Sequence, residues 1–172
     1  MDSPSTLQDL KGVETARQGR IARWVGFAIL LGIVLVSFLG VFGPSRKTLT
    51  TTDGLTSLQL YYGSVVRSGQ AVPLEVTLTR EGGFDGPVTL VFDRDVFDRF
   101  DFQNWYPNPS AEVGTTDTVT YEFDPPDGDV LRVALDARVA PTQFGGRHEY
   151  SVHLDIDGVP TAVTDYVVWV MP

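Results

Sequence analysis

The sequence predicts an all-β domain, a sandwich of two packed sheets with about seven strands, preceded by one N-terminal transmembrane α-helix. Residues 24–43 carry no charged side chain, and the other 152 of the 172 positions hold every Asp, Glu, Lys and Arg. Beyond residue 56, apolar and polar residues alternate in segment after segment, as in half-buried strands. Clusters of Gly, Pro and Asp separate these segments, which is typical of turns.

The uncharged stretch is long enough to cross a bilayer, because a spanning helix needs about 20 predominantly apolar residues. Between Trp24 and Phe42, thirteen residues are Leu, Ile, Phe or Val. On an insertion scale, such residues together favour membrane insertion by roughly 4 to 8 kcal/mol. We therefore expect a transmembrane helix over residues 24–43 that lies in the lipid bilayer.

Two other interpretations of this stretch are a cleaved signal peptide and a buried core helix. A signal peptide has a shorter apolar stretch that ends in a small-x-small cleavage site. Here the best exit, residues 41–43, is followed by Pro44, which is unfavourable directly after a scissile bond. A core helix is disfavoured because the sequence predicts no second apolar helix against which it could pack.

Flanking cations predict the orientation of the helix, since cytoplasmic flanks carry an excess of Lys and Arg. The cations before the helix are Lys11, Arg17, Arg20 and Arg23, and those after it are Arg46 and Lys47. Trp24, directly after Arg23, suits an interface anchor. We expect residues 1–23 to be a short solvated cytoplasmic tail of a single-pass plasma-membrane protein, with residues 44–172 outside the cytoplasm.

The rest of the chain divides into a linker and a domain. Residues 44–56 are rich in Thr, Ser and Gly, and we expect a linker there, or at most a short edge strand. Residues 57–172 form the sandwich, and a domain of this size can fold without disulfides. Its predicted strands cover residues 58–62, 72–78, 88–92, 119–123, 131–139, 150–156 and 163–170. Asp157-Gly158 between the last two strands predicts a two-residue hairpin turn.

Within the domain, residues 83–90 read Gly-Phe-Asp-Gly-Pro-Val-Thr-Leu. This stretch resembles the connection between the second and third strands of bacterial surface immunoglobulin-like domains, where a Gly-Phe-x-Gly turn precedes a Val-Thr-Leu strand. The layout of the whole chain is similar to that of small single-pass envelope proteins of high-G+C Gram-positive bacteria. The resemblance implies an immunoglobulin-like β-sandwich and does not point to any particular activity. The chain lacks the paired cysteines of antibody-type domains.

Composition and motifs exclude several classes of function. The absence of Cys excludes disulfides, thiolate zinc sites and a Cys nucleophile, and a net charge of −9 argues against nucleic acid as a partner. The sequence contains no Gly-x-Ser-x-Gly, His-Glu-x-x-His or phosphate-loop motif. His148 and His153, five residues apart on one predicted strand, should face opposite sides. We expect no enzyme, cofactor or metal site.

Residues 92–109 are unusual because they combine six aromatic residues and four aspartates, without the period of a strand. The candidate interaction residues in this segment are Phe97, Phe100, Phe102, Trp105 and Tyr106. Exposed rings of this kind anchor protein partners or stack on sugars. The alternative is that the rings close the open end of the sandwich, with Phe97 and Phe100 on a helical turn. Several Asp pairs in the loops could bind calcium, but solvated acidic loops explain them more simply.

The features together predict a single-pass membrane protein that presents a non-catalytic extracytoplasmic sandwich, accessory to an unidentified membrane or envelope protein. A surface receptor that binds a glycan or small molecule through residues 92–109 is the alternative, and a structural spacer is a third possibility. Residues 44–172 carry a net charge of −10. We expect the domain to be repelled by anionic headgroups and to stand off the membrane on its linker.

Overall fold

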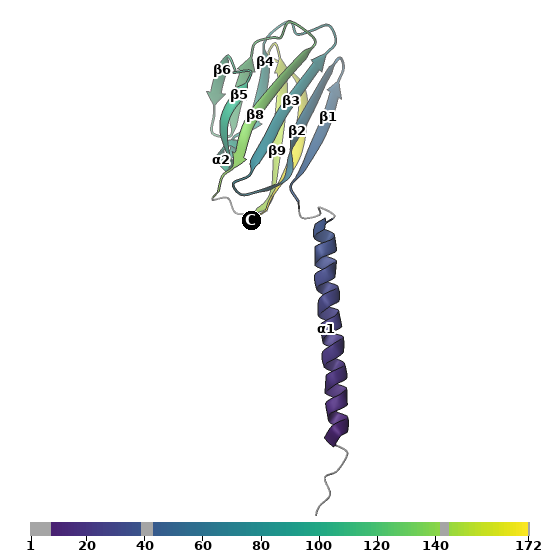
Figure 1. Ribbon diagram of the computed structural model, residues 1–172. Helices are drawn as coiled ribbons and strands as arrows, with labels where there is room; N and C mark the ends of the chain where they lie inside the picture. Colours follow the sequence, from purple (N-terminus) through teal and green to yellow (C-terminus); the bar gives the residue numbers. More distant parts are fainter. Residues whose placement is uncertain (1–7, 39–42, 142–144, 172) are drawn as a thin grey trace, which may run out of the picture. The chain divides into compact units, whose positions relative to one another are not determined.

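A computed structural model of the protein describes residues 8–38, 43–141 and 145–171 (Figure 1). The chain divides into two compact units, Met1–Gly43 and Pro44–Pro172. The first is helical and the second is a β-sandwich, so the predicted fold class is confirmed. Each unit is described below by itself.

The first unit contains one long helix, α1 (Gln8–Phe38). Its segment Gln18–Phe38 is long and apolar enough to cross a membrane or to serve as a signal sequence. The side chain of Ser37 donates a hydrogen bond to the carbonyl oxygen of Ile33 at 2.9 Å, which satisfies a hydroxyl group within the apolar segment. The helix begins well before Trp24, so much of the segment expected as a solvated tail is helical. Residues 39–42 of the predicted span lie outside the described residues.

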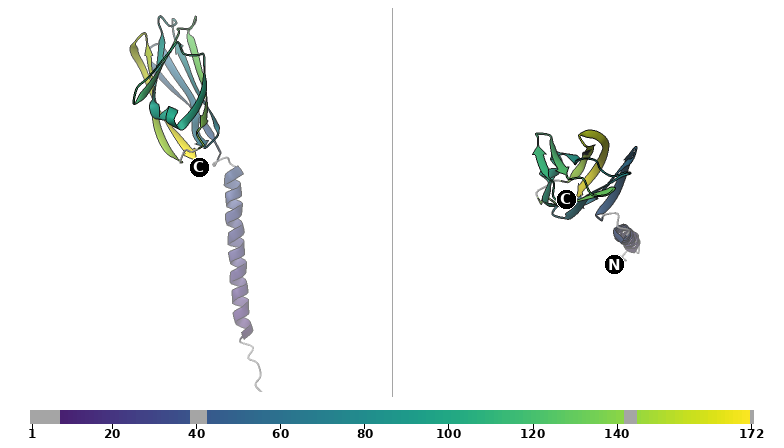
Figure 2. Two further views of the ribbon diagram at one scale, coloured as in Figure 1. Left: turned by 90° about the vertical axis from the view of Figure 1, so that its left-hand side faces the viewer. Right: turned by 90° about the horizontal axis from the view of Figure 1, so that it is seen from above.

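The second unit contains ten strands among the described residues, where the sequence predicted about seven. One layer consists of β1 (Ser45–Asp53), β2 (Thr56–Arg67), β3 (Ala71–Arg80), β8 (Val130–Val139) and β5 (Phe100–Tyr106). The other layer consists of β10 (Val159–Met171), β9 (Gly146–Ile156), β4 (Val88–Asp93), β7 (Thr118–Phe123) and β6 (Ala111–Gly114). Figure 2 shows the two layers facing each other.

The two layers are joined by a short parallel junction between β2 and β10. Trp169, Val170 and Met171 pair with Val65, Val66 and Arg67, whereas all other pairings are antiparallel. Strand pairing is therefore continuous from one layer to the other at this side of the sandwich. At the opposite side, the edges β5 and β6 belong to different layers.

The core lies between the layers and is built by the alternation seen in the sequence. Leu58, Leu60, Leu78 and Leu90 have no exposed surface, while the intervening residues of their strands face outward. Each buried Leu or Phe contributes roughly 1.5 to 3 kcal/mol through burial of its apolar surface. All seven predicted strands are present, and their inward residues form one hydrophobic cluster.

The segment expected as a linker is the first strand of the sandwich. β1 pairs with β2 over its whole length, and Leu49 packs against the core. Hydroxyl groups fasten this strand to its neighbours, with Ser45 Oγ 2.8 Å from Ser64 Oγ and Thr51 Oγ1 2.8 Å from Thr164 Oγ1. The second compact unit therefore begins at Pro44 rather than at residue 57. Among the described strands β1 pairs with β2 alone, so residues 45–53 form the edge strand that the sequence left open as the alternative to a linker.

The turn between β9 and β10 has the predicted geometry. Asp157 has a φ of 52° and Gly158 a φ of 73°, and Ile156 pairs directly with Val159. Two consecutive residues with positive φ form the tight turn that matches the twist of paired strands. The predicted Asp157-Gly158 hairpin is confirmed.

Candidate functional site

The unusual aromatic segment carries the chain from one layer to the other. β4 ends at Asp93, the short helix α2 (Arg94–Arg99) follows, and β5 then joins the opposite layer. The pairing of β4 with β9 ends at Phe92 and Val152. The backbone N–H of Ser151, the next residue of β9 along this pairing, therefore has no backbone acceptor on β4. The carboxylate of Asp93 accepts this hydrogen bond at 2.6 Å, and it also accepts one from the Ser151 hydroxyl at 3.2 Å.

Four of the five candidate rings pack into the sandwich. Phe97 meets Phe92 edge-on at 5.9 Å between ring centroids and lies 4.5 Å from Phe102. Trp105 lies 4.6 Å from Tyr121, and Phe100 is only 6% exposed. Aromatic pairs at these separations add stability beyond the area that they bury. These rings close the sandwich beside α2, which is the alternative that the sequence left open.

Tyr106 is different, because its side chain is 80% exposed at the end of β5. A cis peptide bond joins it to Pro107, and the chain then returns to the other layer as β6. Val113 on β6 is 60% exposed. The role of the five residues in binding stays a prediction, and among them Tyr106 alone presents an exposed ring to a partner.

A polar group that the sequence analysis missed lies on the outer face of β9. Ser151 Oγ lies 3.3 Å from His153 Nε2 and also contacts the carboxylate of Asp93. In a catalytic triad, the histidine sits between the acid and the serine. Here the serine sits between the other two, so Asp93 does not orient the imidazole. The geometry does not match a serine hydrolase.

Two hollows flank this group on the same face. One of about 290 Å³ is lined by Asp93, Arg94, Asp95, Thr116, Asp117, Glu149 and Tyr150. The other, of about 440 Å³, is lined by Asp93, Glu149, Tyr150, Ser151, Asp165, Tyr166 and Val167. Their linings are predominantly acidic, with Arg94 as the one cation. Such a surface attracts positively charged groups.

A tyrosine cluster lies beneath these hollows, in the core. The rings of Tyr62, Tyr166 and Tyr150 follow one another at centroid separations of 5.0 and 5.5 Å. The hydroxyl groups of Tyr150 and Tyr166 are buried and have no hydrogen-bond partner among the described residues. Burial raises the pKa of Tyr150 to about 12 and also raises the pKa of Tyr166. A cavity of about 20 Å³, lined in part by Tyr62 and Tyr166, has room for one water molecule.

The two histidines lie on opposite faces of β9, as predicted. His148 is inward-facing and its Nε2 is buried, whereas His153 is exposed. Burial lowers the pKa of His148, and the nearby charge of Arg99 lowers it further. Within residues 8–38, 43–141 and 145–171, no three His, Asp or Glu side chains gather as metal ligands.

Comparisons with known proteins give only distant structural similarities and no family. No protein-family model matches the chain, and no curated protein matches it. Among solved structures, it is similar to the N-terminal domain of the Streptococcus gordonii adhesin Sgo0707, with 12% identity and a TM-score of 0.45. That match covers 75% of this chain but 33% of the adhesin chain, so the chain spans about a third of that structure.

Two further solved structures are similar to the chain at a comparable distance. A non-cellulosomal cohesin from Archaeoglobus fulgidus has 13% identity and a TM-score of 0.39, over 64% of this chain and 88% of the cohesin. A protein described as catalysing macrocyclisation in alchivemycin A biosynthesis has 13% identity and a TM-score of 0.37, over 75% and 89% of the two chains. The neighbours are distant β-sandwich domains, consistent with an immunoglobulin-like fold, and they include both binding modules and enzymes.

Proposed function

We propose that the protein is a single-pass plasma-membrane protein whose extracytoplasmic sandwich is a non-catalytic interaction module, accessory to a membrane or envelope complex. The main support is the helical segment Gln18–Phe38, which is apolar and is not buried within the protein. Trp24, Phe27 and Leu30 are each at least 60% exposed. Side chains of this kind require an apolar solvent, and a bilayer supplies one.

The orientation in the proposal rests on the flanking cations. Four bases, the last of them Arg23, precede the uncharged residues 24–43, and two follow these residues closely, which favours a cytoplasmic N-terminus. A protease added outside intact cells should then degrade the sandwich and spare the N-terminal segment. Survival of the sandwich until the membrane is opened would reverse the orientation, and a shortened mature protein would favour a cleaved signal.

The sandwich supports binding of a partner at Tyr106 better than it supports catalysis. Its ring is the exposed member of an otherwise packed aromatic group, and Val113 adds a second exposed apolar side chain on the strand after the turn. Tyrosine combines a large apolar face with a hydroxyl group, and it is enriched where interfaces concentrate binding energy. The Asp93, Ser151 and His153 arrangement lacks the order that nucleophilic catalysis needs.

Site-specific crosslinking in intact cells tests this function. A photo-reactive residue replaces Tyr106 in the full-length protein, and the captured proteins are identified by mass spectrometry. The control carries the same group at Val163, which is 49% exposed and lies on β10, in the layer opposite to that of β5. We expect a specific membrane or envelope protein from position 106 alone. Equal capture at both positions, or none, would contradict the proposed contact.

The second candidate is a receptor that binds a glycan or small molecule at the same ring. Its support is the exposure of Tyr106, since an isolated aromatic face can stack on a sugar. A glycan panel screened against the soluble domain distinguishes the two candidates. Binding that Tyr106→Ala abolishes, together with no captured protein, would favour the receptor.

A further inference from the structure

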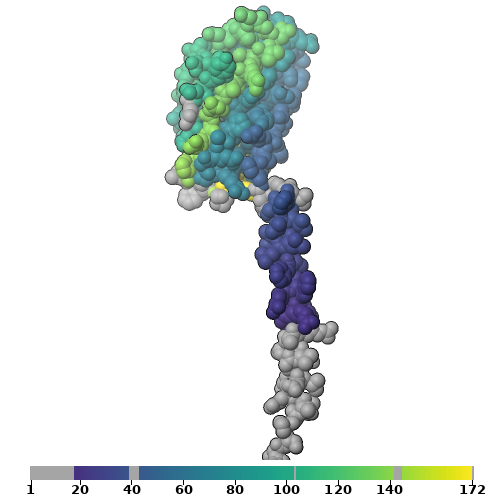
Figure 3. Space-filling model, in the orientation of Figure 1, coloured from purple at the N-terminus to yellow at the C-terminus, as the bar shows by residue number. Residues whose placement is uncertain are grey.

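A hollow that the function proposed above does not use lies on the outer face of the layer that contains β1, β2, β3, β8 and β5. Its volume is about 410 Å³, and small-molecule sites usually have about 300 to 1,000 Å³. Figure 3 shows this face, with β1, β2 and β3 in blue and β8 in green. The residues that line the hollow include Arg46, Tyr61, Ala71, Pro73, Asp136 and Arg138.

Short side chains on β3, between longer ones on the strands around it, produce this hollow. Ala71 and Pro73 are outward-facing residues of β3, and they pair with Arg138 and Asp136 of β8. Arg46 of β1 lines the hollow from the side of β2. The floor is therefore short and apolar, and charged side chains stand on two sides of it.

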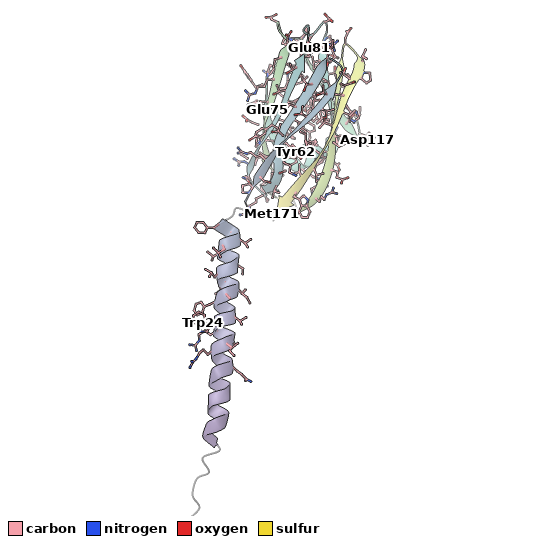
Figure 4. All side chains as sticks on the ribbon, turned by 90° about the vertical axis from the view of Figure 1, so that its right-hand side faces the viewer. Trp24, Tyr62, Glu75, Glu81, Asp117 and Met171 are labelled. Atoms are coloured by element: carbon pink, nitrogen blue, oxygen red, sulfur yellow. The ribbon has the colours of Figure 1, made fainter. Side chains whose placement is uncertain are left out.

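The charges in and around the hollow offset one another. Asp136 lines the same hollow as the cations, and Arg138 pairs across the strands with Asp101 of β5. On the same face, Arg132 donates hydrogen bonds to both carboxylate oxygens of Glu75, at 2.6 and 2.7 Å. Figure 4 shows Glu75 on this side of the sandwich. A neutral polar ligand therefore fits this face better than an anion or a cation does.

The polar groups of the hollow supply hydrogen-bond donors and acceptors together. Arg46 Nη1 donates a hydrogen bond to the Tyr61 hydroxyl at 3.2 Å, and a hydroxyl group that accepts one hydrogen bond can still donate its own proton. The guanidinium group of Arg138 is a further donor, and the carboxylate of Asp136 is an acceptor. Guanidinium and carboxylate groups form hydrogen bonds in pairs, which suits a ligand with adjacent hydroxyl groups.

Apolar surface lies beside these polar groups. The half-buried Tyr61 lines the hollow together with Ala71 and Pro73. A tyrosine ring packs against C–H groups while its hydroxyl group bonds to polar atoms. A sugar ring has C–H groups on its faces and hydroxyl groups around its rim, so it matches both parts of the lining.

We propose that this hollow binds a neutral saccharide. The Tyr61 ring packs against a face of the sugar, Arg46 and Arg138 donate hydrogen bonds to its oxygen atoms, and Asp136 accepts hydrogen bonds from its hydroxyl groups. An acidic sugar would bring its carboxylate close to Asp136, and an amino sugar would bring its ammonium group close to the two guanidinium groups. The neutral sugar avoids both repulsions.

The saccharide site is separate from the contact proposed at Tyr106. Tyr61 and Tyr106 lie in one row across the strands of this layer, with one residue of β3 and one of β8 between them. Three strand spacings thus separate the two tyrosines, which is about 14 Å. Since a ligand in the hollow leaves the Tyr106 ring accessible, this inference goes beyond the proposed function and does not require it.

A glycan array tests the proposal with the full-length protein in nanodiscs. The array carries neutral oligosaccharides of glucose, galactose, mannose and N-acetylglucosamine, and acidic counterparts that contain a uronic or sialic acid. We expect the protein to bind at least one neutral saccharide, and to bind its acidic counterparts more weakly. An array without binding, or a preference for the acidic saccharides, would overturn the proposal.

Paired variants locate the site. Tyr61→Ala and Asp136→Asn should each weaken binding of the saccharide by about tenfold or more, because each removes a direct contact. The matched controls are Tyr106→Ala, which removes the other ring of the row, and Asp165→Asn, which removes an exposed carboxylate from the opposite layer. Both controls should bind within about twofold of the unmodified protein. Tyr61→Phe keeps the packing of the half-buried ring and should also weaken binding, since it removes the hydroxyl group.

Amide chemical shifts of residues 44–172, which form their own core, show directly where the bound saccharide lies. We expect the saccharide to shift the amide signals of Ala71, Ala137 and Arg138. Shifts confined to β9 and β10, or binding that Tyr106→Ala abolishes and Tyr61→Ala does not, would overturn the proposal. Capture of a protein at position 106 does not depend on any of these results, so the two proposals fail separately.

Discussion

Gly86 packs directly against Asp157, which lies 71 positions later in the chain. A Cβ atom at Gly86 would lie 2.7 Å from Asp157 Oδ1 and 3.0 Å from Asp157 Cβ. The backbone also joins the two segments, because the N–H of Asp157 donates to the carbonyl oxygen of Pro87 at 3.0 Å. The loop before β4 and the hairpin between β9 and β10 therefore fit together only when position 86 lacks a side chain.

Gly86→Ala should therefore destabilise the domain by about 1 to 3 kcal/mol, the usual cost of an inserted methyl group in a packed site. Chemical denaturation of residues 44–172 measures this change. Gly128→Ala is the control, because a Cβ atom there has no neighbour within 4 Å. Equal stability of the two variants would show that the hairpin shifts freely, contrary to the packing described.

Asp93→Ala should cost about 1 to 3 kcal/mol, because it leaves the Ser151 N–H without its acceptor in a partly buried place. Asp93→Asn retains an acceptor oxygen and should recover part of the loss. Thermal unfolding of both variants measures the difference. Identical melting of Asp93→Ala and the unmodified domain would mean that water replaces the carboxylate without cost.

Replacement of a packed ring should reduce the stability of the domain much more than replacement of the exposed ring. Trp105→Ala removes a ring in contact with Phe92, Tyr121 and Phe123, and we expect a loss of about 3 kcal/mol. Tyr106→Ala removes an exposed ring and should change stability by no more than about 0.5 kcal/mol. Denaturant titration of the two variants checks this contrast. A large loss from Tyr106→Ala would mean that binding defects of this variant cannot be assigned to a partner contact.

Alkali should destabilise the domain through its tyrosine cluster. Burial holds the folded-state pKa of Tyr150 at about 12, above its ordinary value of 10.0, and also raises that of Tyr166. The unfolded chain loses these protons first, so the stabilising contribution is complete below pH 10 and is lost as the pH rises through 12. Unfolding free energies measured across this range should decline. Tyr150→Phe with Tyr166→Phe should flatten the decline, and an unchanged slope would exclude these groups as its cause.

Amide hydrogen exchange distinguishes a strand from a linker over residues 45–53. We expect the amides of β1 that bond to β2 to exchange slowly, at rates comparable to those of the partner residues Leu58 and Leu60. Rapid exchange throughout the segment would show that residues 45–53 form a linker and not a paired strand. Thr51→Val should also accelerate exchange in β1, because it removes the hydroxyl contact to Thr164.

The sequence was sufficient to predict the strands whose inward-facing residues are large and apolar. β3 and β8 have alternating Val and Leu residues that pair across the sheet, such as Val76 with Val133, and their period identified them. β1 was expected only as an alternative to a linker, because Leu49 is its one large apolar residue and hydroxyl groups of Ser and Thr make its other contacts. β5 was missed because its register shifts between Phe102 and Asn104, which interrupts the period of a strand.

The candidate site was only partly accessible from the sequence. Composition identified the aromatic segment, but which rings face inward depends on where the chain crosses between layers. The pairing of Asp93 with Ser151 joins residues 58 positions apart and has no local signature.

The pairing of the first strand also determines how the sandwich bears a mechanical load applied at its N-terminal end. Tension applied at Ser45 runs along β1, which is paired with β2 from Ser45 to Asp53. Ladder hydrogen bonds lie perpendicular to the strands, so a pull along β1 shears them together instead of opening them one by one. A flexible linker would simply extend under the same pull. The first strand thus makes the sandwich a stiff force-bearing attachment.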